Sequence, residues 1–233
     1  MKWLLLSSGP GAAAFNMAVD EILLETASQS GTPVLRLYGW KQPAATFGYF
    51  QKYAAVELAT PLRPLIRRPT GGGIVPHDAD WTYSFVAPPD HEWHSLAAIE
   101  SYRRMHAWIQ SAFARLKIET ELAPCSRKPA DGNSNQEIPG ACFIGHEKFD
   151  LLWHGKKIAG AAQRRNKSGL LIQGSVQPPV PLARGDWENA MVEAARKDFG
   201  IEWQAWSPDE NFRTQVESLA AEKFSQESFN RKR

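Results

Sequence analysis

The pattern of hydrophobic and polar positions predicts several short strands along the chain. Residues 3–6 are apolar, and the Gly9-Pro10-Gly11 sequence is expected to end the strand that they form. Residues 34–40 and 44–50 are rich in aliphatic, β-branched and aromatic side chains, which predicts a second strand and its pairing partner. Residues 81–86 alternate large side chains with small polar ones, so we expect a half-buried strand there.

Helical spacing of apolar residues first appears after Phe15. Apolar side chains from Val19 onward recur at the interval of one helix face, whereas Asp20 and Glu21 fall outside that stripe. This predicts an amphipathic helix of about three turns with both carboxylates on its polar side. Asn16 lies near the start, where an asparagine acts most often as a cap and otherwise as a polar group facing a pocket.

Three further helices are predicted. The longest covers residues 95–116, and another lies near 186–199. The Ser207-Pro208-Asp209-Glu210 sequence has a capping-box pattern with proline at the first helical position, which predicts a last helix over about 208–228. We expect the Arg231-Lys232-Arg233 end to be frayed and solvated.

The middle of the chain predicts an antiparallel meander. Two turns, one at His154-Gly155 and one at 166–169, separate three strand-like runs at 149–153, 156–162 and 170–176. Residues 124–140, which precede the first run, are rich in Pro, Gly, Asn and Ser and are expected to form a loop. Because strands and helices are interspersed, the predicted class is α/β or α+β, with a mixed, largely antiparallel sheet flanked by helices.

Length and composition narrow the function classes. The 233 residues show no internal repeat or linker, which favours a single domain over 1–233 with a core at about 3–205. The formal net charge of +2 gives no support to a nucleic-acid binder. The apolar run near the N-terminus is too short for a signal peptide, and no window is long enough for a membrane span. Cys125 and Cys142 have neither disulfide-framework nor zinc-type spacing, so we expect no metal and a cytoplasmic location.

One stretch combines fixed positive charge with three consecutive glycines. Arg67 and Arg68 lead into Gly71-Gly72-Gly73, and His77-Asp78 follow. Glycine has no Cβ, so this backbone can adopt positive φ and approach a ligand closely. The sequence is compatible with a ligand-lining loop and with an ordinary glycine-rich hairpin turn flanked by surface arginines.

Four segments in order resemble the biotin/lipoate A/B protein ligase family, which contains lipoate–protein ligases and octanoyl- or lipoyltransferases. The resemblance covers about residues 3–180. It implies a biotin-synthetase-like catalytic domain without an accessory domain. The segments that carry it are Asn16-Met17-Ala18-Val19-Asp20-Glu21, Leu35-Arg36-Leu37-Tyr38-Gly39-Trp40 with Phe47-Gly48-Tyr49, Arg67 to Gly73 with His77-Asp78, and Gly155 to Gln163.

The resemblance also implies an acyl-binding tunnel. Lys157 is the implied donor to the acyl carbonyl oxygen as negative charge develops there. An apolar slot is expected from Tyr38, Trp40 and Phe47 with Ala159, Ala161 and Ala162. The substrate-binding residues implied in this way are Tyr38, Arg67, Arg68, Gly71, Gly72, Gly73, His77, Gly160 and Ala161.

Cys142 distinguishes the activities within the family. One transferase subfamily has Ala-Cys-Phe, an acidic residue eight positions after the cysteine, and then Lys-x-x-Gly; here these are Cys142, Asp150 and Lys157 to Gly160. A thiolate attacks a thioester and splits acyl transfer into two steps. The opposing interpretation is a buried, inert cysteine. The chain departs from the subfamily at Ile144-Gly145-His146 and at Gln173, where many relatives carry histidine.

The leading hypothesis is therefore a transferase that needs no cofactor and moves an octanoyl or lipoyl group through a Cys142 acyl-enzyme. Its implied donor is octanoyl-acyl carrier protein, and its acceptor is a lipoyl domain or the glycine-cleavage H protein. The first alternative is a lipoate–protein ligase that uses free lipoate, ATP and Mg²⁺, and the second is a non-catalytic acyl- or lipoyl-domain-binding protein. A basic rim that steers an acidic partner, or else a merely solvated face, is expected from Arg67, Arg68, Arg164, Arg165 and Lys167.

Overall fold

A large mixed sheet forms the centre of the chain. The computed structural model describes residues 1–126 and 145–233. Eight strands lie in the order β11-β1-β2-β6-β10-β9-β8-β7, with β1 parallel to β2 and β11 and every other pair antiparallel. Their bounds are β1 Lys2–Gly11, β2 Val34–Trp40, β6 Trp81–Ala87, β7 Glu121–Leu122, β8 Leu151–Trp153, β9 Lys156–Asn166, β10 Gly169–Val176 and β11 Glu202–Ala205.

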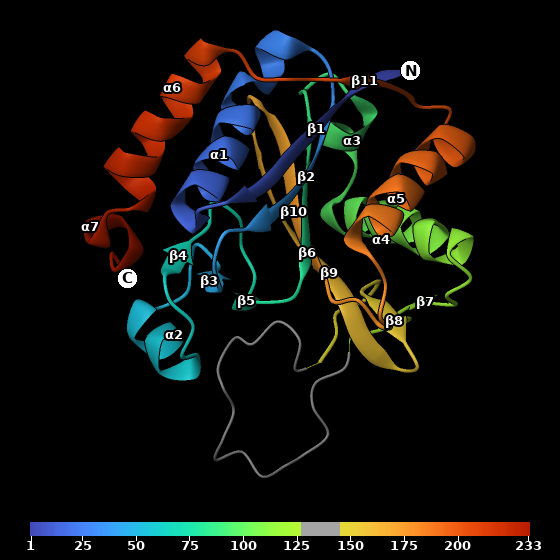
Figure 1. Ribbon diagram of the computed structural model, residues 1–233, viewed down its shortest axis with the longest axis horizontal. Helices are drawn as coiled ribbons and strands as arrows, with labels where there is room; N and C mark the ends of the chain where they lie inside the picture. Colours follow the sequence, from blue (N-terminus) through green and yellow to red (C-terminus); the bar gives the residue numbers. More distant parts are fainter. Residues whose placement is uncertain (127–144) are drawn as a thin grey trace.

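Helices cover both faces of this sheet. Figure 1 shows α1 and α6 on one face and α4 and α5 on the other. Two separate apolar clusters fill the two interfaces, one around Trp108 and Trp187 and the other around Met17 and Phe224. The helices are α1 Ala13–Ser30, α3 Glu92–Ser95, α4 Ala98–Arg115, α5 Arg184–Phe199, α6 Glu210–Leu219, a π-helical turn at Ala220–Phe224 and α7 Glu227–Asn230.

A small second sheet carries the glycine-rich stretch. It has the order β4-β3-β5, with β3 at Ala44–Phe47, β4 at Leu65–Arg67 and β5 at Val75–His77. Helix α2, Tyr53–Ala59, follows β3, and its buried Val56 belongs to the same apolar cluster as Phe47 and Ile74. The glycines therefore lie between β4 and β5 (Figure 1), and Gly72 lines a pocket with the N-terminal half of β9 and the C-terminal half of β10.

The predicted class and the β8-β9-β10 meander are confirmed, but several local predictions are wrong. Gly9-Pro10-Gly11 does not end the first strand, because a bulge between Ser7 and Gly9, where φ of Gly9 is 64°, lets β1 continue along β2. Residues 44–47 pair with β4 and β5 rather than with β2. Strand β6 is buried along its whole length, because helices cover both faces of the sheet. Strand β11 was not predicted.

The polar residues of α1 are also not where the periodicity placed them. Asp20 and Glu21 are buried, at 0% and 3% exposure. Asn16 is not the cap, which is Ala12, and its side chain instead donates to the carbonyl of Gly39 at 2.9 Å. The helix contacts the sheet, α6 and the C-terminal turn together, so little of its circumference faces solvent.

The longest helix and the C-terminal region also differ from expectation. The helix predicted over 95–116 is confirmed as α4, but it begins at Ala98 because the backbone at Leu96 is extended, and the short α3 precedes it. The last helix begins with Asp209 as its cap, accepting from the backbone N–H of Phe212, and it does not run unbroken to residue 228. The chain end is not frayed, because the Tyr53 N–H donates to the Arg233 carbonyl at 2.8 Å and Lys232 Nζ lies 3.9 Å from the ring centroid of Tyr49.

In residues 1–126 and 145–233, no helix has the length and hydrophobicity that crossing a membrane requires.

Candidate functional site

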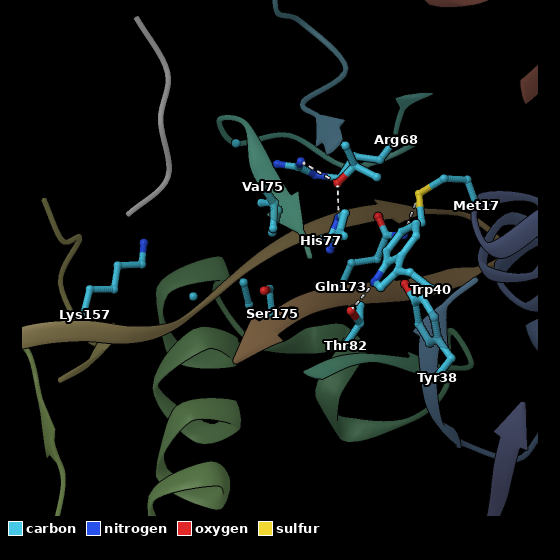
Figure 2. Close-up of a pocket in the computed structure, with 16 residues that line it drawn as sticks. Met17, Tyr38, Trp40, Arg68, Val75, His77, Thr82, Lys157, Gln173 and Ser175 are labelled. Carbon is cyan, nitrogen blue, oxygen red and sulfur yellow. Dashed lines mark hydrogen bonds between the residues drawn. The ribbon is translucent and has the colours of Figure 1, made fainter. Parts of the chain in front are cut away.

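A pocket lies between α1, the ends of β9 and β10, and the small sheet. It brings together most of the residues that the sequence singled out: Tyr38, Trp40, Arg68, Gly72, His77, Lys157, Gly160, Ala161 and Ala162. Its further lining residues are Met17, Thr46, Val75, Thr82, Gln173, Gly174 and Ser175. Figure 2 shows Lys157 at one end, Trp40 and Met17 at the other, and Ser175 between them.

Lys157 forms an ion pair at its end of the pocket. Its Nζ lies 2.7 Å from Oδ2 of Asp150, and both side chains are less than one-tenth exposed. The same carboxylate oxygen accepts the backbone N–H of Glu147 at 2.7 Å. The ammonium lies over Gly160, where an added Cβ would be 2.8 Å from Nζ. The absence of a side chain at Gly160 therefore makes room for the lysine.

A buried carboxylate organises the middle of the pocket. Oδ2 of Asp80 accepts from His77 Nδ1 at 2.9 Å, from Thr82 Oγ1 at 3.0 Å and from Ser175 Oγ at 2.7 Å. The other carboxylate oxygen of Asp80 has no hydrogen-bond partner among the described residues. Trp40 stacks on the His77 ring with centroids 3.8 Å apart and donates its indole N–H to Thr82 at 2.7 Å. Three pocket-lining side chains are thus fixed by one acid.

The partner of His77 is not the acid beside it in the sequence. Asp78, the neighbour that completed the predicted motif, is exposed, whereas Asp80 is buried against the imidazole. Nε2 of His77 lies 2.8 Å from the hydroxyl of Thr46. Both ring nitrogens are therefore engaged, which fixes the orientation of the ring.

The guanidinium of Arg68 holds the glycine loop in place. It donates to the carbonyls of Gly71 at 2.6 Å and Gly73 at 2.8 Å, so these two glycines direct polar groups toward the arginine. Gly72 lies between them at a φ of 85° and lines the pocket. Gly48 packs directly against the Gly72 carbonyl, where a Cβ would collide. The loop is thus closely packed against Arg68 and against Gly48, which directly follows β3.

A second buried carboxylate, Asp20, lies behind the far end of the pocket. It accepts from Arg36, Tyr38, Ser84 and Gln173 at 2.7, 3.0, 2.7 and 2.7 Å. Burial, and next the charge of Asp20, raises the pKa of Tyr38 well above its ordinary value, so the phenol stays a donor. Gln173 also accepts from Thr70 at 2.7 Å, so its amide is satisfied within the wall. The polar atoms here turn toward the protein.

Arg67 is directed away from the pocket. Its guanidinium donates to the carbonyls of Tyr49, Gln51 and Asn230, each within 2.8 Å. Burial lowers its pKa from the ordinary arginine value. Phe47 and Ala159, which the sequence suggested for the acyl slot, lie in the apolar clusters and are not among the lining residues.

The expected basic rim is not formed by the arginines beside the glycine loop. Arg67 and Arg68 are buried, at 0% and 4% exposure. Arg164 pairs with Glu21 at 3.3 Å, and Arg165 donates to the His94 carbonyl at 2.6 Å. For Arg67 and Arg68 this corrects the docking rim that we expected, whereas Arg165 and Lys167 are exposed and their part in a rim stays a prediction.

Cys142, the predicted nucleophile, lies outside the described residues. His146, four positions further along the sequence, is described, and its Nδ1 is buried with no partner among the described residues. Cys125 is exposed and not disulfide-bonded. Within 1–126 and 145–233, no three His, Cys, Asp or Glu side chains cluster as metal ligands would.

The pocket residues that sequence reasoning missed come from strand alternation. Thr82 and Ser175 are small polar residues on paired strands and are register partners. Ser175 is also the register partner of Gly160 on the other side, so its side chain lies on the sheet face to which a Cβ at Gly160 would point, and this is the face where Lys157 Nζ lies. The alternation along each strand was visible, but the pairing between strands was not.

Solved structures identify the class of fold. The chain superimposes on a putative lipoate protein ligase from T. acidophilum with bound lipoic acid at a TM-score of 0.80, with 20% identity and 100% of each chain covered. A lipoate-protein ligase A bound with ATP gives a TM-score of 0.77 at 21% identity, covering 99% of each chain. This is the fold of lipoate–protein ligases.

Sequence comparison then gives the family. A family model for the lipoyl protein ligase A/B catalytic domain matches residues 12–221, and the chain belongs to this family, which confirms the resemblance. Octanoyltransferase LipM of Kyrpidia tusciae is 36% identical over 182 residues, covering 75% of this chain and 65% of the relative. Octanoyltransferase LipM of Bacillus subtilis is 34% identical over 182 residues, covering 75% and 64%. The chain spans about two thirds of the length of these curated relatives.

Proposed function

We propose that the chain transfers an octanoyl or lipoyl group from a carrier-protein thioester to a lysine side chain, through a thioester on Cys142. The observation that carries the proposal is the Lys157–Asp150 pair at one end of a pocket whose other end is lined by Trp40 and Met17. In the proposed binding mode the acyl chain occupies the end lined by Trp40 and Met17, with its carbonyl toward the Lys157 ammonium. The relatives named octanoyltransferase, at 34–36% identity, support the same chemistry.

The proposed reaction has two acyl transfers. The Cys142 thiolate attacks the carbonyl carbon of the donor thioester, and collapse of the tetrahedral oxyanion expels the carrier thiol as thiolate, which takes up a proton. The neutral amine of the acceptor lysine then attacks the acyl-enzyme, forms an amide, and transfers its proton as the Cys142 thiolate leaves. Lys157 stabilises both oxyanions, because its ammonium is already fixed by Asp150 before charge develops.

The proposed partners follow from this chemistry. The donor is octanoyl-acyl carrier protein, and the acceptor is the target lysine of a lipoyl domain or of the glycine-cleavage H protein. The transferase reaction balances without ATP, because the thioester already carries an activated acyl group. We therefore propose that it requires no cofactor.

A second candidate is the ATP-dependent lipoate ligase reaction. The triple glycine beside Arg68 favours it, because backbone next to a guanidinium is suited to an acyl-adenylate phosphate. In this reaction Arg68, the Gly71–Gly73 loop and Lys157 hold the adenylate, and Mg²⁺ accompanies ATP. Free lipoate would replace the carrier thioester as donor.

One set of incubations separates these functions. With octanoyl-acyl carrier protein, intact mass spectrometry should detect an octanoyl adduct that is lost in Cys142→Ser and retained in Cys125→Ser. Loss of the adduct in Cys125→Ser instead would place it on that thiol. Equal turnover by Cys142→Ala would remove Cys142 from the mechanism. Release of pyrophosphate from ATP and free lipoate would support the ligase. Binding of the acyl carrier without adduct or product would support a non-catalytic binding protein.

A further inference from the structure

A buried histidine lies behind the Lys157–Asp150 pair, on the face of the sheet that α4 covers. His106 is 1% exposed, and its Nδ1 lies 2.6 Å from the carbonyl oxygen of Phe149. Since a carbonyl only accepts, Nδ1 carries the proton and donates. Nε2 is buried and has no hydrogen-bond partner among the described residues. The mechanism proposed above makes no use of this imidazole.

The residue that receives this hydrogen bond has an unusual backbone. Phe149 has a φ of 71°, in the left-handed region that non-glycine residues rarely adopt. Its N–H donates to the carbonyl of Ala123 at 2.8 Å, so both polar groups of this peptide unit have partners. A conformation of this kind persists only where its surroundings hold it in place.

Asp150 follows Phe149 directly, and its direction depends on that turn. Its backbone N–H donates to the Glu147 carbonyl at 3.0 Å, and its carbonyl accepts from the Ala123 N–H at 2.8 Å. Its Oδ2 accepts from the Glu147 N–H and pairs with Lys157 Nζ, both at 2.7 Å. A change in the Phe149 dihedrals would therefore redirect the carboxylate that holds the lysine.

We infer that His106 is a positioning residue: its hydrogen bond to Phe149 fixes the turn that aims Asp150, and through it Lys157, into the pocket. The inference rests on the proposed function for its catalytic consequence. The claim that His106 fixes the position of Asp150 and Lys157 does not depend on which acyl reaction the pocket performs.

The protonation state of the imidazole agrees with this role. Burial is the main cause that lowers the pKa of His106, and the charge of Lys157 acts in the same direction, while Asp150 and the Phe149 hydrogen bond oppose it. A neutral ring donates through Nδ1 and adds no second cation beside Lys157. Tyr83 also faces this region, and its hydroxyl has no partner in the described part of the chain.

Three substitutions separate a positioning role from simple packing. His106→Asn places an amide N–H where Nδ1 lies, His106→Gln places it nearer to Nε2, and His106→Leu fills the space without a donor. All three are compared for Tm and circular dichroism, so that a variant that fails to fold is recognised. The octanoyl-transfer assay then gives kcat and KM for each folded variant.

The expected result is a loss in kcat of about 10- to 100-fold in His106→Leu and His106→Gln, because misplacing a catalytic group by about 1 Å costs rate of this order. KM should change little, since the acyl end of the pocket is untouched. His106→Asn should restore most of the rate. Equal kcat in all three variants, or a loss in His106→Asn as large as in His106→Leu, would overturn the inference.

A second readout does not require any acyl activity. Reductive methylation followed by peptide mass spectrometry measures the labelling rate of Lys157 relative to its exposed neighbour Lys156. In His106→Leu the ratio should rise several-fold, and in His106→Asn it should stay at the wild-type value. If the wild type transfers no acyl group but the ratio rises in this way, the proposed function fails while the positioning role stands. An unchanged ratio in His106→Leu would contradict the positioning role itself.

Discussion

Arg36 and Asp20 form an ion pair that is entirely excluded from solvent, with NH1 2.7 Å from Oδ1 and both side chains at 0% exposure. It joins α1 to β2 immediately behind the pocket wall. The guanidinium also donates to the carbonyl and the side-chain oxygen of Asn16 at 2.9 and 2.8 Å. Asp20 also accepts from Tyr38 and Gln173, which line the pocket, so the pair supports the pocket as well as the fold.

Removing the acid from this pair should destabilise the protein strongly. Asp20→Ala leaves the Arg36 charge buried without its partner, which typically costs about 3–5 kcal/mol. Glu25→Ala, at an exposed position on the same helix, should change the free energy of unfolding by less than about 0.5 kcal/mol. Urea denaturation of both variants measures the difference, and a similar small loss in each would show that the pair contributes little.

The burial of Asp20 shows where sequence reasoning reached its limit. Local periodicity correctly indicated a helix, but it assigned Asp20 and Glu21 to a solvated face because charged residues are seldom buried. The compensating Arg36 is 16 positions away and on a strand, so the pairing depends on tertiary structure. The meander over β8, β9 and β10 was predictable because turn residues and alternation are local signals.

The pocket residues likewise divide into those that local sequence signals predict and those that only the tertiary structure reveals. Lys157, Gly160 and the glycine loop were found from their short motifs, and the structure brings them to one cavity. Asp80 was missed because Asp78 is adjacent to His77 in sequence, while only the geometry of the strand end selects the residue three positions on. Arg67 and Arg68 are neighbours in sequence, but Arg68 donates to the glycine loop whereas Arg67 donates to backbone carbonyls on the other side of β4, which residue type alone does not reveal.

A side chain at Gly160 should displace the lysine. In Gly160→Ala the new Cβ would lie 2.7 Å from Cε and 2.8 Å from Nζ of Lys157, closer than real Cβ contacts, so the flexible lysine must move. We expect acyl transfer to fall by about 10- to 100-fold with the fold retained, since a displacement of about 1 Å is enough for a loss of this size.

The control for this variant is Gly185→Ala, in the first turn of α5, where a Cβ meets nothing within 4 Å. It should leave the transfer rate unchanged and stabilise the helix by up to about 1 kcal/mol. Rates with octanoyl-acyl carrier protein measure the comparison. Wild-type activity in Gly160→Ala would show that the position of Lys157 over this glycine is not required.

The C-terminal segment should be released by a single change at Asn230. Its Oδ1 accepts from the Arg67 N–H at 2.8 Å, and its Nδ2 donates to the Phe224 carbonyl at 2.9 Å. Asn230→Ala leaves buried backbone groups without these partners, at a cost of about 1–3 kcal/mol each. Hydrogen exchange over residues 220–233 should become faster, whereas Asn211→Ala, at an exposed position on α6, should not alter it. Unchanged exchange in Asn230→Ala would mean that other contacts hold the segment.

Stability should fall in mildly acidic solution, partly because of His106. Burial lowers the pKa of His106 below its ordinary value of about 6.5. Below that pH the unfolded chain binds a proton that the folded protein does not, so the free energy of unfolding decreases as pH falls, by up to about 1.4 kcal/mol per pH unit. His91, whose pKa burial also lowers, contributes in the same direction in every variant.

His106→Asn isolates the contribution of this residue, because asparagine keeps the hydrogen-bond donor and does not titrate. Urea denaturation at pH 7.5 and 5.5 should show a smaller loss of stability in His106→Asn than in the wild type. The difference between the two losses is the linkage of His106 alone, since His91 and the carboxylates are common to both proteins. Equal losses would mean that His106 binds its proton as readily when folded as when unfolded. The negative charge of Asp150 would then offset the desolvation of the imidazole in full.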